Sequence, residues 1–252
     1  MKNLKDIILE HFKYSKFSIL GHFEYSNFSI YERLRINKDT GNHHYNYHPK
    51  TRDELKELVD KLIEERGYNA DLNDIDTSEI TDMNFMFYDS SFNGDISEWN
   101  VSNVKDMSAM FWDSSFTGKN GDISNWDVSN VKDIRGIFKN TEFNGDISNW
   151  DVSKVKNMRV MFYGSSFNGD ISKWDVSNVD DMYSMFAHSS FTGENGDISN
   201  WDVSNVKNMM DMFAYSKFNG DISKWDVSNV KNMKDMFYKS PFKKNPPKWY
   251  EE

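Results

Sequence analysis

The stretch NGDISNWDVS at residues 144–153 recurs along most of the chain, and its period decides the fold prediction. Six copies carry a tryptophan, at spacings of 27, 24, 24, 27 and 24 residues: Trp99, Trp126, Trp150, Trp174, Trp201 and Trp225. An earlier, degenerate copy begins at Asp71, with Leu72 in place of the isoleucine and Ile75 in place of the tryptophan. Seven copies of one 24- to 27-residue unit therefore fill residues 71–242. Such periodicity is typical of repeat proteins, in which neighbouring units bury each other's apolar side chains.

The first half of the unit predicts a turn followed by a short strand. In the copy at 144–167, Asn144-Gly145 is a turn signal, because glycine accepts the positive φ that such turns need. Ile147, Trp150 and Val152 then follow the spacing of the strand portion of a leucine-rich repeat. Strands of successive units would add in parallel, about 4.8 Å apart.

The second half of the unit predicts a short helix. Ser153 is suited to cap it, and the apolar residues that follow recur at helical spacing: Val155, Met158, Met161 and Phe162. The expected fold class is therefore an α/β repeat solenoid, leucine-rich-repeat-like. Each turn of 24–27 residues would contain one short parallel strand and one short helix.

Both ends of the repeat array have their own signals, which divide the chain into four parts. Thr51 to Glu54 forms a capping box, an apolar stripe follows, and Gly67 lies just past its end, so a helical N-terminal cap is expected. The predicted organisation is an N-terminal segment (1–46), the helical cap (47–70), seven repeats (71–242) and a C-terminal cap (243–252). The stripe of the cap helix is Leu55, Leu58, Val59, Leu62 and Ile63.

The phrases FNGDISNWDVS (143–153) and DIDTSEITDM (74–83), with YHPKT (47–51) before them, resemble the BspA-like leucine-rich-repeat proteins of bacteria. The resemblance covers about residues 47–250. It implies a leucine-rich-repeat-like solenoid with a role in adhesion or protein binding, and it supplies no shared catalytic residues. Many of these proteins carry a secretion signal or a lipid-anchor cysteine, whereas this chain has no cysteine and no early apolar run of signal length.

Composition narrows the function classes. Residues 71–252 carry 18 Lys and Arg against 29 Asp and Glu, a net charge of −11, which disfavours a nucleic-acid binder. No apolar run approaches a membrane span. If Met1 is the native start, a cytoplasmic or virion-associated location is expected; if the chain is trimmed, the cell surface. We expect a non-enzymatic protein-binding scaffold or adhesin-like module without a cofactor. The alternative is a structural or cargo protein of a phage or mobile element.

Repeated aspartates form two series that could bind either backbone amides or cations. One series follows each glycine of the repeat: Asp95, Asp122, Asp146, Asp170, Asp197 and Asp221. The other follows each tryptophan: Asp127, Asp151, Asp175, Asp202 and Asp226, with Asn100 at the first position. Hydrogen bonding to backbone N–H groups in turns is favoured over a calcium ladder, because the glycine-rich nonapeptide of calcium-binding β-rolls is missing. A zinc site at His43, His44 and His48 lacks a fourth ligand, so no metal site is expected.

Positions that vary while the repeat frame stays fixed are the candidates for partner binding. Their aromatic and charged side chains would form a contact surface, although the rings could instead pack between repeats. The candidates are Tyr88, Trp112, Tyr163, Tyr183, Tyr215, Tyr238, Lys173 and Lys224. A tandem duplication, HFKYSKFSI (11–19) and HFEYSNFSI (22–30), predicts a docking segment; a hairpin folded onto the cap is the alternative. Its aromatic residues are Phe12, Tyr14, Phe17, Phe23, Tyr25 and Phe28.

Overall fold

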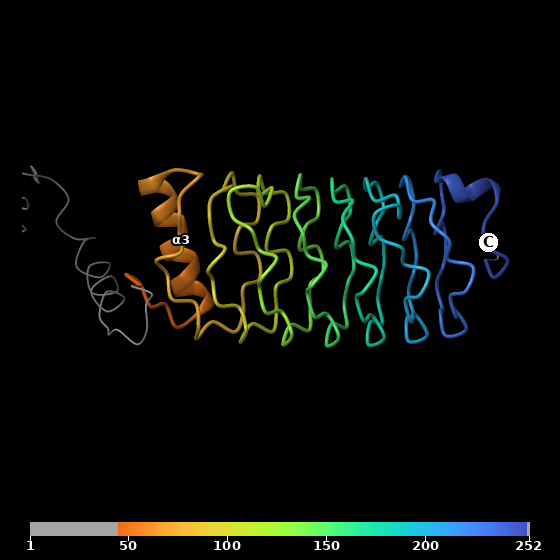
Figure 1. Ribbon diagram of the computed structural model, residues 1–252, viewed down its shortest axis with the longest axis horizontal. Coiled ribbons are helices and arrows are strands. Elements are labelled where there is room, and N and C mark those ends of the chain that lie inside the picture. Colours follow the sequence, from red (N-terminus) through yellow and green to blue (C-terminus); the bar gives the residue numbers. More distant parts are fainter. Residues whose placement is uncertain (1–44, 251–252) are drawn as a thin grey trace, which may run out of the picture. The chain divides into compact units, whose positions relative to one another are not determined.

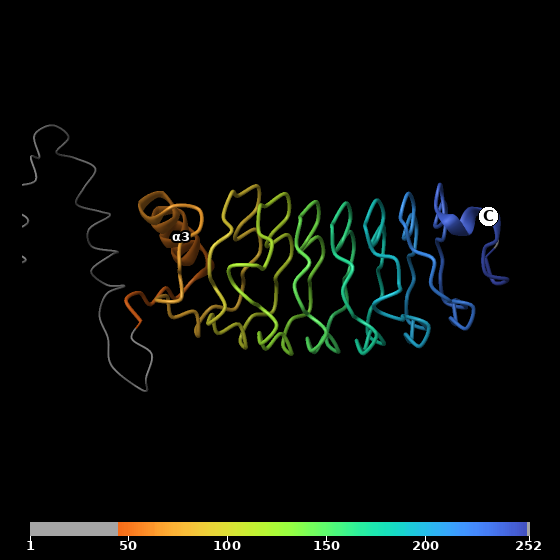
Figure 2. The ribbon, with the colours of Figure 1, turned by 45° about the horizontal axis from the view of Figure 1, so that its top comes forward.

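The computed structural model describes residues 45–250, all of which lie in one unit, Asp39–Glu252. Helix α3 (Arg52–Arg66) lies at one end of this part of the chain, and the short 3-10 helix η1 (Pro241–Lys244) lies near the other. Between them the chain winds in successive coils of similar outline, each stacked on the one before (Figures 1 and 2).

Helix α3 begins where its capping signals predict. The side chain of Thr51 accepts a hydrogen bond from the Glu54 amide at 3.2 Å, and the amide of Gly67 bonds to the carbonyl of Ile63 at 2.8 Å. The five apolar residues of the predicted stripe are all buried. Outside the stripe, the Arg52 guanidinium donates two hydrogen bonds to the carbonyl oxygen of Asn84, at 3.1 and 3.0 Å. The helix is thereby joined to the first coil by polar as well as apolar contacts.

The predicted strand in each repeat is wrong. In the copy at 144–167, the amide of Trp150 bonds back to the carbonyl of Ile147 at 3.1 Å, which closes a β-turn where the strand was expected. The aspartate before the turn fixes it, since Asp146 Oδ1 accepts the amide of Ser148 at 2.9 Å. Within residues 45–250, pairing between coils takes the form of isolated parallel bridges, and no strand is present.

The predicted helix in each repeat is also wrong. Val160 and Gly164 have φ angles of 47° and 64°, and a residue with positive φ interrupts a right-handed helix. Every coil repeats this pair of left-handed residues four positions apart, so the spacing of three between Met158 and Met161 comes from a β-turn. Alternate amides donate their hydrogen bonds to the next coil instead of to their own. The amides of Met158, Val160, Phe162 and Gly164 bond to its carbonyls at 2.8–3.0 Å.

The expected leucine-rich-repeat-like α/β solenoid is therefore not the fold of residues 45–250. Apolar side chains at intervals of three or two point inward in either architecture, so their spacing alone does not separate a strand and helix from consecutive turns. The positive φ predicted for Gly145 is also wrong, because its φ is not positive. Glycine is needed there because an added Cβ would lie 2.9 Å from the ring of Phe143.

Three ladders of aromatic rings fill the inside of the stack. The tryptophans are almost fully buried, and each indole Nε1 donates to the carbonyl of an apolar residue in the preceding coil; for Trp150 the acceptor is Ile123, at 3.1 Å. Two phenylalanines per coil stack on their counterparts, such as Phe138 on Phe162 with ring centroids 6.0 Å apart. Trp249 continues the tryptophan ladder beyond the seventh repeat: it stacks on Trp225 and donates to the carbonyl of Ile222 at 3.0 Å. The C-terminal segment thus adds part of another coil.

Candidate binding surface

The repeated aspartates bind backbone amides, as the favoured interpretation predicted. In both series the Oδ1 atom of the aspartate accepts the amide of the serine two residues later, at 2.8–3.1 Å. Hydrogen bonds from the amide and hydroxyl of Ser148 lower the pKa of Asp146, and those from the hydroxyl and amide of Ser153 lower that of Asp151. Within residues 45–250, no group of three or more His, Asp or Glu side chains is placed to hold a metal ion. The aspartates therefore act as turn-forming residues.

Acid should destabilise the fold through these aspartates. A carboxylate whose pKa is lower in the folded state contributes fully above its unfolded value of about 3.9, and that contribution is lost as the pH falls through the folded value. Nine described aspartates have a lowered pKa, whereas burial raises that of Asp133 and Asp211. We expect the melting temperature to fall as the pH is lowered below about 4.

A variant with Asp146→Asn, Asp151→Asn and Asp170→Asn tests this cause. Asparagine keeps the Oδ1 acceptor, as Asn100 and Asn157 already do at equivalent turns. The variant should melt near the wild-type temperature at pH 7 and lose less stability between pH 5 and pH 3. An equal loss in both proteins would assign acid sensitivity to other groups.

Along one side of the coils, rings and cations contact each other from coil to coil. We call this set the aromatic–cation row: Phe85, Tyr88, Trp112, Lys139, Tyr163, His188, Tyr215 and Tyr238. In its first half, the rings of Tyr88 and Trp112 meet edge to face at 6.0 Å. The ammonium of Lys139 lies 3.8 Å from the centroid of Trp112 and 5.0 Å from that of Tyr163. Its partial burial lowers the pKa of Lys139, although the charge of Asp113 acts in the opposite direction.

In its second half, the row shifts by one residue along the coil. Ala187 and Ala214 occupy the expected position and are buried, and the next residues, His188 and Tyr215, carry the row instead. His188 lies between two tyrosines, 5.2 Å from Tyr163 and stacked on Tyr215 at 4.4 Å. His188 and Tyr215 are exposed, whereas the alanines before them are buried.

The row contacts itself and also faces solvent. Tyr88, Tyr215 and Tyr238 are 46%, 43% and 37% exposed, and Phe85 is 42% exposed. Packing of the rings between coils, one of the two interpretations left open by the sequence, is therefore confirmed, and contact with a partner through their exposed sides stays a prediction. Such pre-ordered rings lose little conformational entropy on contact with a partner.

The remaining candidate residues lie apart from this row. Tyr183 contacts the guanidinium of Arg159, which is paired with Asp181 at 2.9 Å, and no contact joins it to the row within residues 45–250. Lys173 is exposed beside the Asp146 and Asp170 carboxylates, and Lys224 is exposed near Asp221. His48 pairs with Asp76 at 3.1 Å. His43, His44 and the predicted docking segment lie outside the described residues.

Sequence reasoning missed Phe85 altogether, which lies at a left-handed position of a turn. Lys139 and His188 occupy positions that vary among the copies, but they were not among the residues selected for partner binding. In Tyr88-Asp89 the ring stands at the first of the two positions. In Ala187-His188 and Ala214-Tyr215 an alanine stands first and the ring second. That exchange was a usable signal, but its meaning depends on knowing that both positions lie on one turn.

Comparison with known proteins gives a family but no function. None of the helices within residues 45–250 is long and apolar enough to cross a membrane. No curated protein and no solved structure matches the chain. One family does match, in three overlapping segments (53–165, 115–195 and 164–251), which together span most of the sequence. That match tests neither the resemblance to BspA-like proteins nor a binding function, and both stay predictions. The chain belongs to the family described as Mycoplasma protein of unknown function, DUF285.

Proposed function

We propose that this chain is a non-enzymatic scaffold that binds another protein along its aromatic–cation row. The observation that carries the proposal is the unbroken series of contacts from Phe85 to Tyr238, with rings that are partly exposed. Exposed tyrosine and tryptophan side chains are enriched among the residues that dominate protein interfaces. The repeat supplies such a residue at regular intervals, so an elongated partner surface is the best fit.

Charge along the row favours a partner with both acidic and basic groups. Asp89 and Asp113 are exposed beside Tyr88 and Trp112, in the first coils. At the other end, the ammonium groups of Lys239 and Lys243 lie 5.5 and 4.8 Å from the ring of Tyr238. A partner with basic groups toward the first coils and acidic groups toward the last would be complementary in a single orientation.

Capture experiments with two matched variants test the proposal. One variant carries Tyr88→Ser, Tyr163→Ser and Tyr215→Ser in the row; the control carries Asn125→Ser, Asn149→Ser and Asn200→Ser at exposed positions outside it. Because truncating an interface aromatic side chain often costs more than 1 kcal/mol, recovery of a specific partner should fall at least tenfold with the first variant only. Equal recovery by both variants, at unchanged melting temperatures, would contradict a role for the row.

A further inference from the structure

The last complete coil ends four columns of stacked backbone hydrogen bonds. In each column, one amide per coil donates to a carbonyl of the next coil, six times in succession. The final bonds join the amides of Met209, Asp211, Phe213 and Tyr215 to the carbonyls of Asn232, Lys234, Met236 and Tyr238, at 2.7–3.0 Å. All four columns therefore run in the same direction, with their amides directed toward the C-terminal end.

At that end the next four amides are left without an acceptor. The N–H groups of Met233, Asp235, Phe237 and Lys239 occupy the donor positions of the columns, and within residues 45–250 none of them makes a hydrogen bond. At the opposite end of the columns, a carbonyl group has a partner outside the coils: the guanidinium of Arg52 in α3 donates to the carbonyl of Asn84. We call the four unpaired amides and the side chains around them the C-terminal edge.

The charge of the C-terminal edge is opposite to that of the coils before it. Residues 71–227 carry 12 Lys and Arg against 26 Asp and Glu, a net charge of −14; residues 228–250 carry six Lys and one Asp, a net charge of +5. Aligned peptide dipoles add a partial positive charge where their N–H groups are free, as they do at the start of a helix. Backbone and side chains at this edge therefore both favour an acidic ligand.

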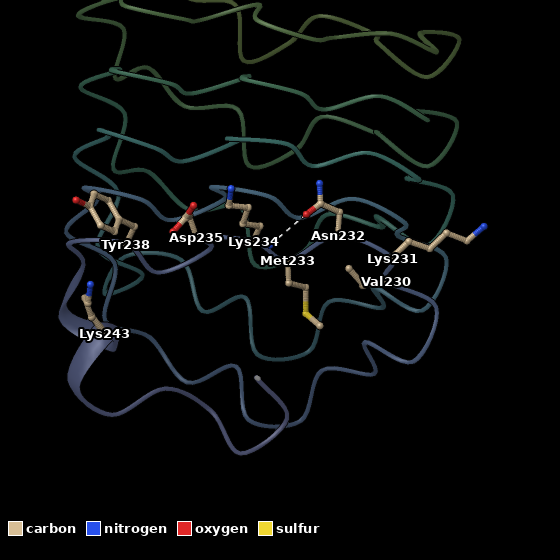
Figure 3. Close-up of a pocket in the computed structure, with 8 residues that line it drawn as sticks. All are labelled: Val230, Lys231, Asn232, Met233, Lys234, Asp235, Tyr238 and Lys243. Atoms are coloured by element: carbon tan, nitrogen blue, oxygen red, sulfur yellow. Dashed lines mark hydrogen bonds between the residues drawn. The ribbon is translucent and has the colours of Figure 1, made fainter. Parts of the chain in front are cut away.

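The edge borders an open hollow of about 600 Å³ (Figure 3). Lys231, Met233, Lys234, Asp235 and Tyr238 of the last coil line it, together with Lys243 of η1. The side chain of Asn232 accepts the amide of Lys234 at 3.1 Å, which holds the turn within this edge (Figure 3). The segment that follows packs on the buried side chain of Phe237, where the rings of Phe242 and Tyr250 lie 5.2 and 4.9 Å from it, and Trp249 stacks on Trp225. The hollow lies beside this buried side chain and is lined by other residues of the edge.

We propose that the C-terminal edge binds an extended acidic segment of a partner protein. Carbonyl groups of the segment accept hydrogen bonds from the four free amides, as the carbonyls of a further coil would, and its carboxylates pair with Lys231, Lys234 and Lys243. This is addition of a chain to an exposed edge, with affinity from the backbone and selectivity from the side chains. It centres on the four free amides, which lie apart from the aromatic–cation row, although Tyr238, Lys239 and Lys243 border both surfaces. Because the row is tested at Tyr88, Tyr163 and Tyr215, either proposal can fail alone.

A second copy of this chain is a poorer occupant. Lysines on an exposed edge oppose pairing with a like edge, and every copy carries the same lysines there. The carbonyl edge of another copy's first coil is already in contact with α3 through Asn84. The same lysines attract an acidic segment. They therefore favour an acidic partner as well as opposing pairing with a second copy.

The test uses the full chain and two fluorescein-labelled heptapeptides, one alternating glutamate with valine and the other lysine with valine. Fluorescence anisotropy should show at least tenfold tighter binding of the glutamate peptide. The double substitution Lys234→Glu and Lys243→Glu should weaken that binding at least tenfold. The control Lys132→Glu and Lys207→Glu, at exposed positions of inner coils, should change it less than twofold.

Hydrogen exchange identifies the backbone contribution. The amides of Met233, Asp235, Phe237 and Lys239 should exchange rapidly in the free protein and become protected when the glutamate peptide binds. Binding without this protection, or equal weakening by both double substitutions, would overturn the proposal. Sedimentation that shows a dimer dispersed by Lys234→Glu and Lys243→Glu would instead assign the edge to a second copy.

Discussion

Replacing Trp150 with alanine is expected to lower the free energy of unfolding by about 3–5 kcal/mol. The indole is 3% exposed, stacks on Trp126 at 6.5 Å and lies 6.0 Å from the ring of Phe138. Its removal leaves a cavity between two coils and also leaves the carbonyl of Ile123 without its indole donor. Denaturant unfolding followed by circular dichroism measures the loss.

Trp249→Ala is the matched control for position in the stack. Trp249 makes the same hydrogen bond and the same stacking contact on one side, but it is only half-buried, and no described coil covers its other side. Its replacement should therefore cost clearly less. Equal losses for the two variants would mean that Trp249 is held as firmly as an inner tryptophan.

Gly94→Ala should be nearly as damaging, although it adds only one methyl group. An added Cβ would overlap the carbonyl oxygen of Ala70, the atom that accepts the Asp95 amide at 2.9 Å. Relief requires a shift of backbone where the segment after α3 meets the second repeat. Forcing extra atoms into packed structure typically costs about 1–3 kcal/mol, and a rigid backbone neighbour places this site at the upper end.

Gly145→Ala provides the comparison, because it occupies the equivalent position in a later repeat. There the added Cβ would meet only the Phe143 ring, at 2.9 Å, and a side chain can yield more easily than a carbonyl group. Gly145→Ala should thus cost less than Gly94→Ala in the same unfolding experiment. A Gly94→Ala protein as stable as wild type would show that the segment after α3 is not tightly joined to the second repeat at Ala70.

Helix α3 could be predicted from sequence because its signals are local. Thr51 caps the helix through an amide three residues away, and the apolar stripe from Leu55 to Ile63 needs only the period of a helix to be recognised. The same is true of the aspartate turns, in which Asp146 binds an amide two residues later. Interactions between residues a few positions apart can therefore be predicted from the local sequence.

The coil itself could not be predicted in this way, because contacts between coils stabilise its backbone. Left-handed φ angles at non-glycine residues such as Val160 are intrinsically unfavourable by roughly 1–2 kcal/mol. In the coils before the last, the amide of each such residue bonds to the next coil; the amide of Val160, for example, donates to the carbonyl of Tyr183 at 2.8 Å. The prediction from helical spacing therefore identified the right core residues, Met158 and Met161 among them, but it assigned them to a helix where the structure has turns.

The sequence by itself determined the period, the buried residues, the terminal helix and the amide-binding role of the aspartates, because each follows from composition or from contacts a few residues apart. Only the tertiary structure decided that the coils consist of turns, that His188 joins the aromatic–cation row and that four amides remain free at the C-terminal edge. Those features depend on hydrogen bonds and ring contacts between residues about 24 positions apart, whose register is set when the coils stack.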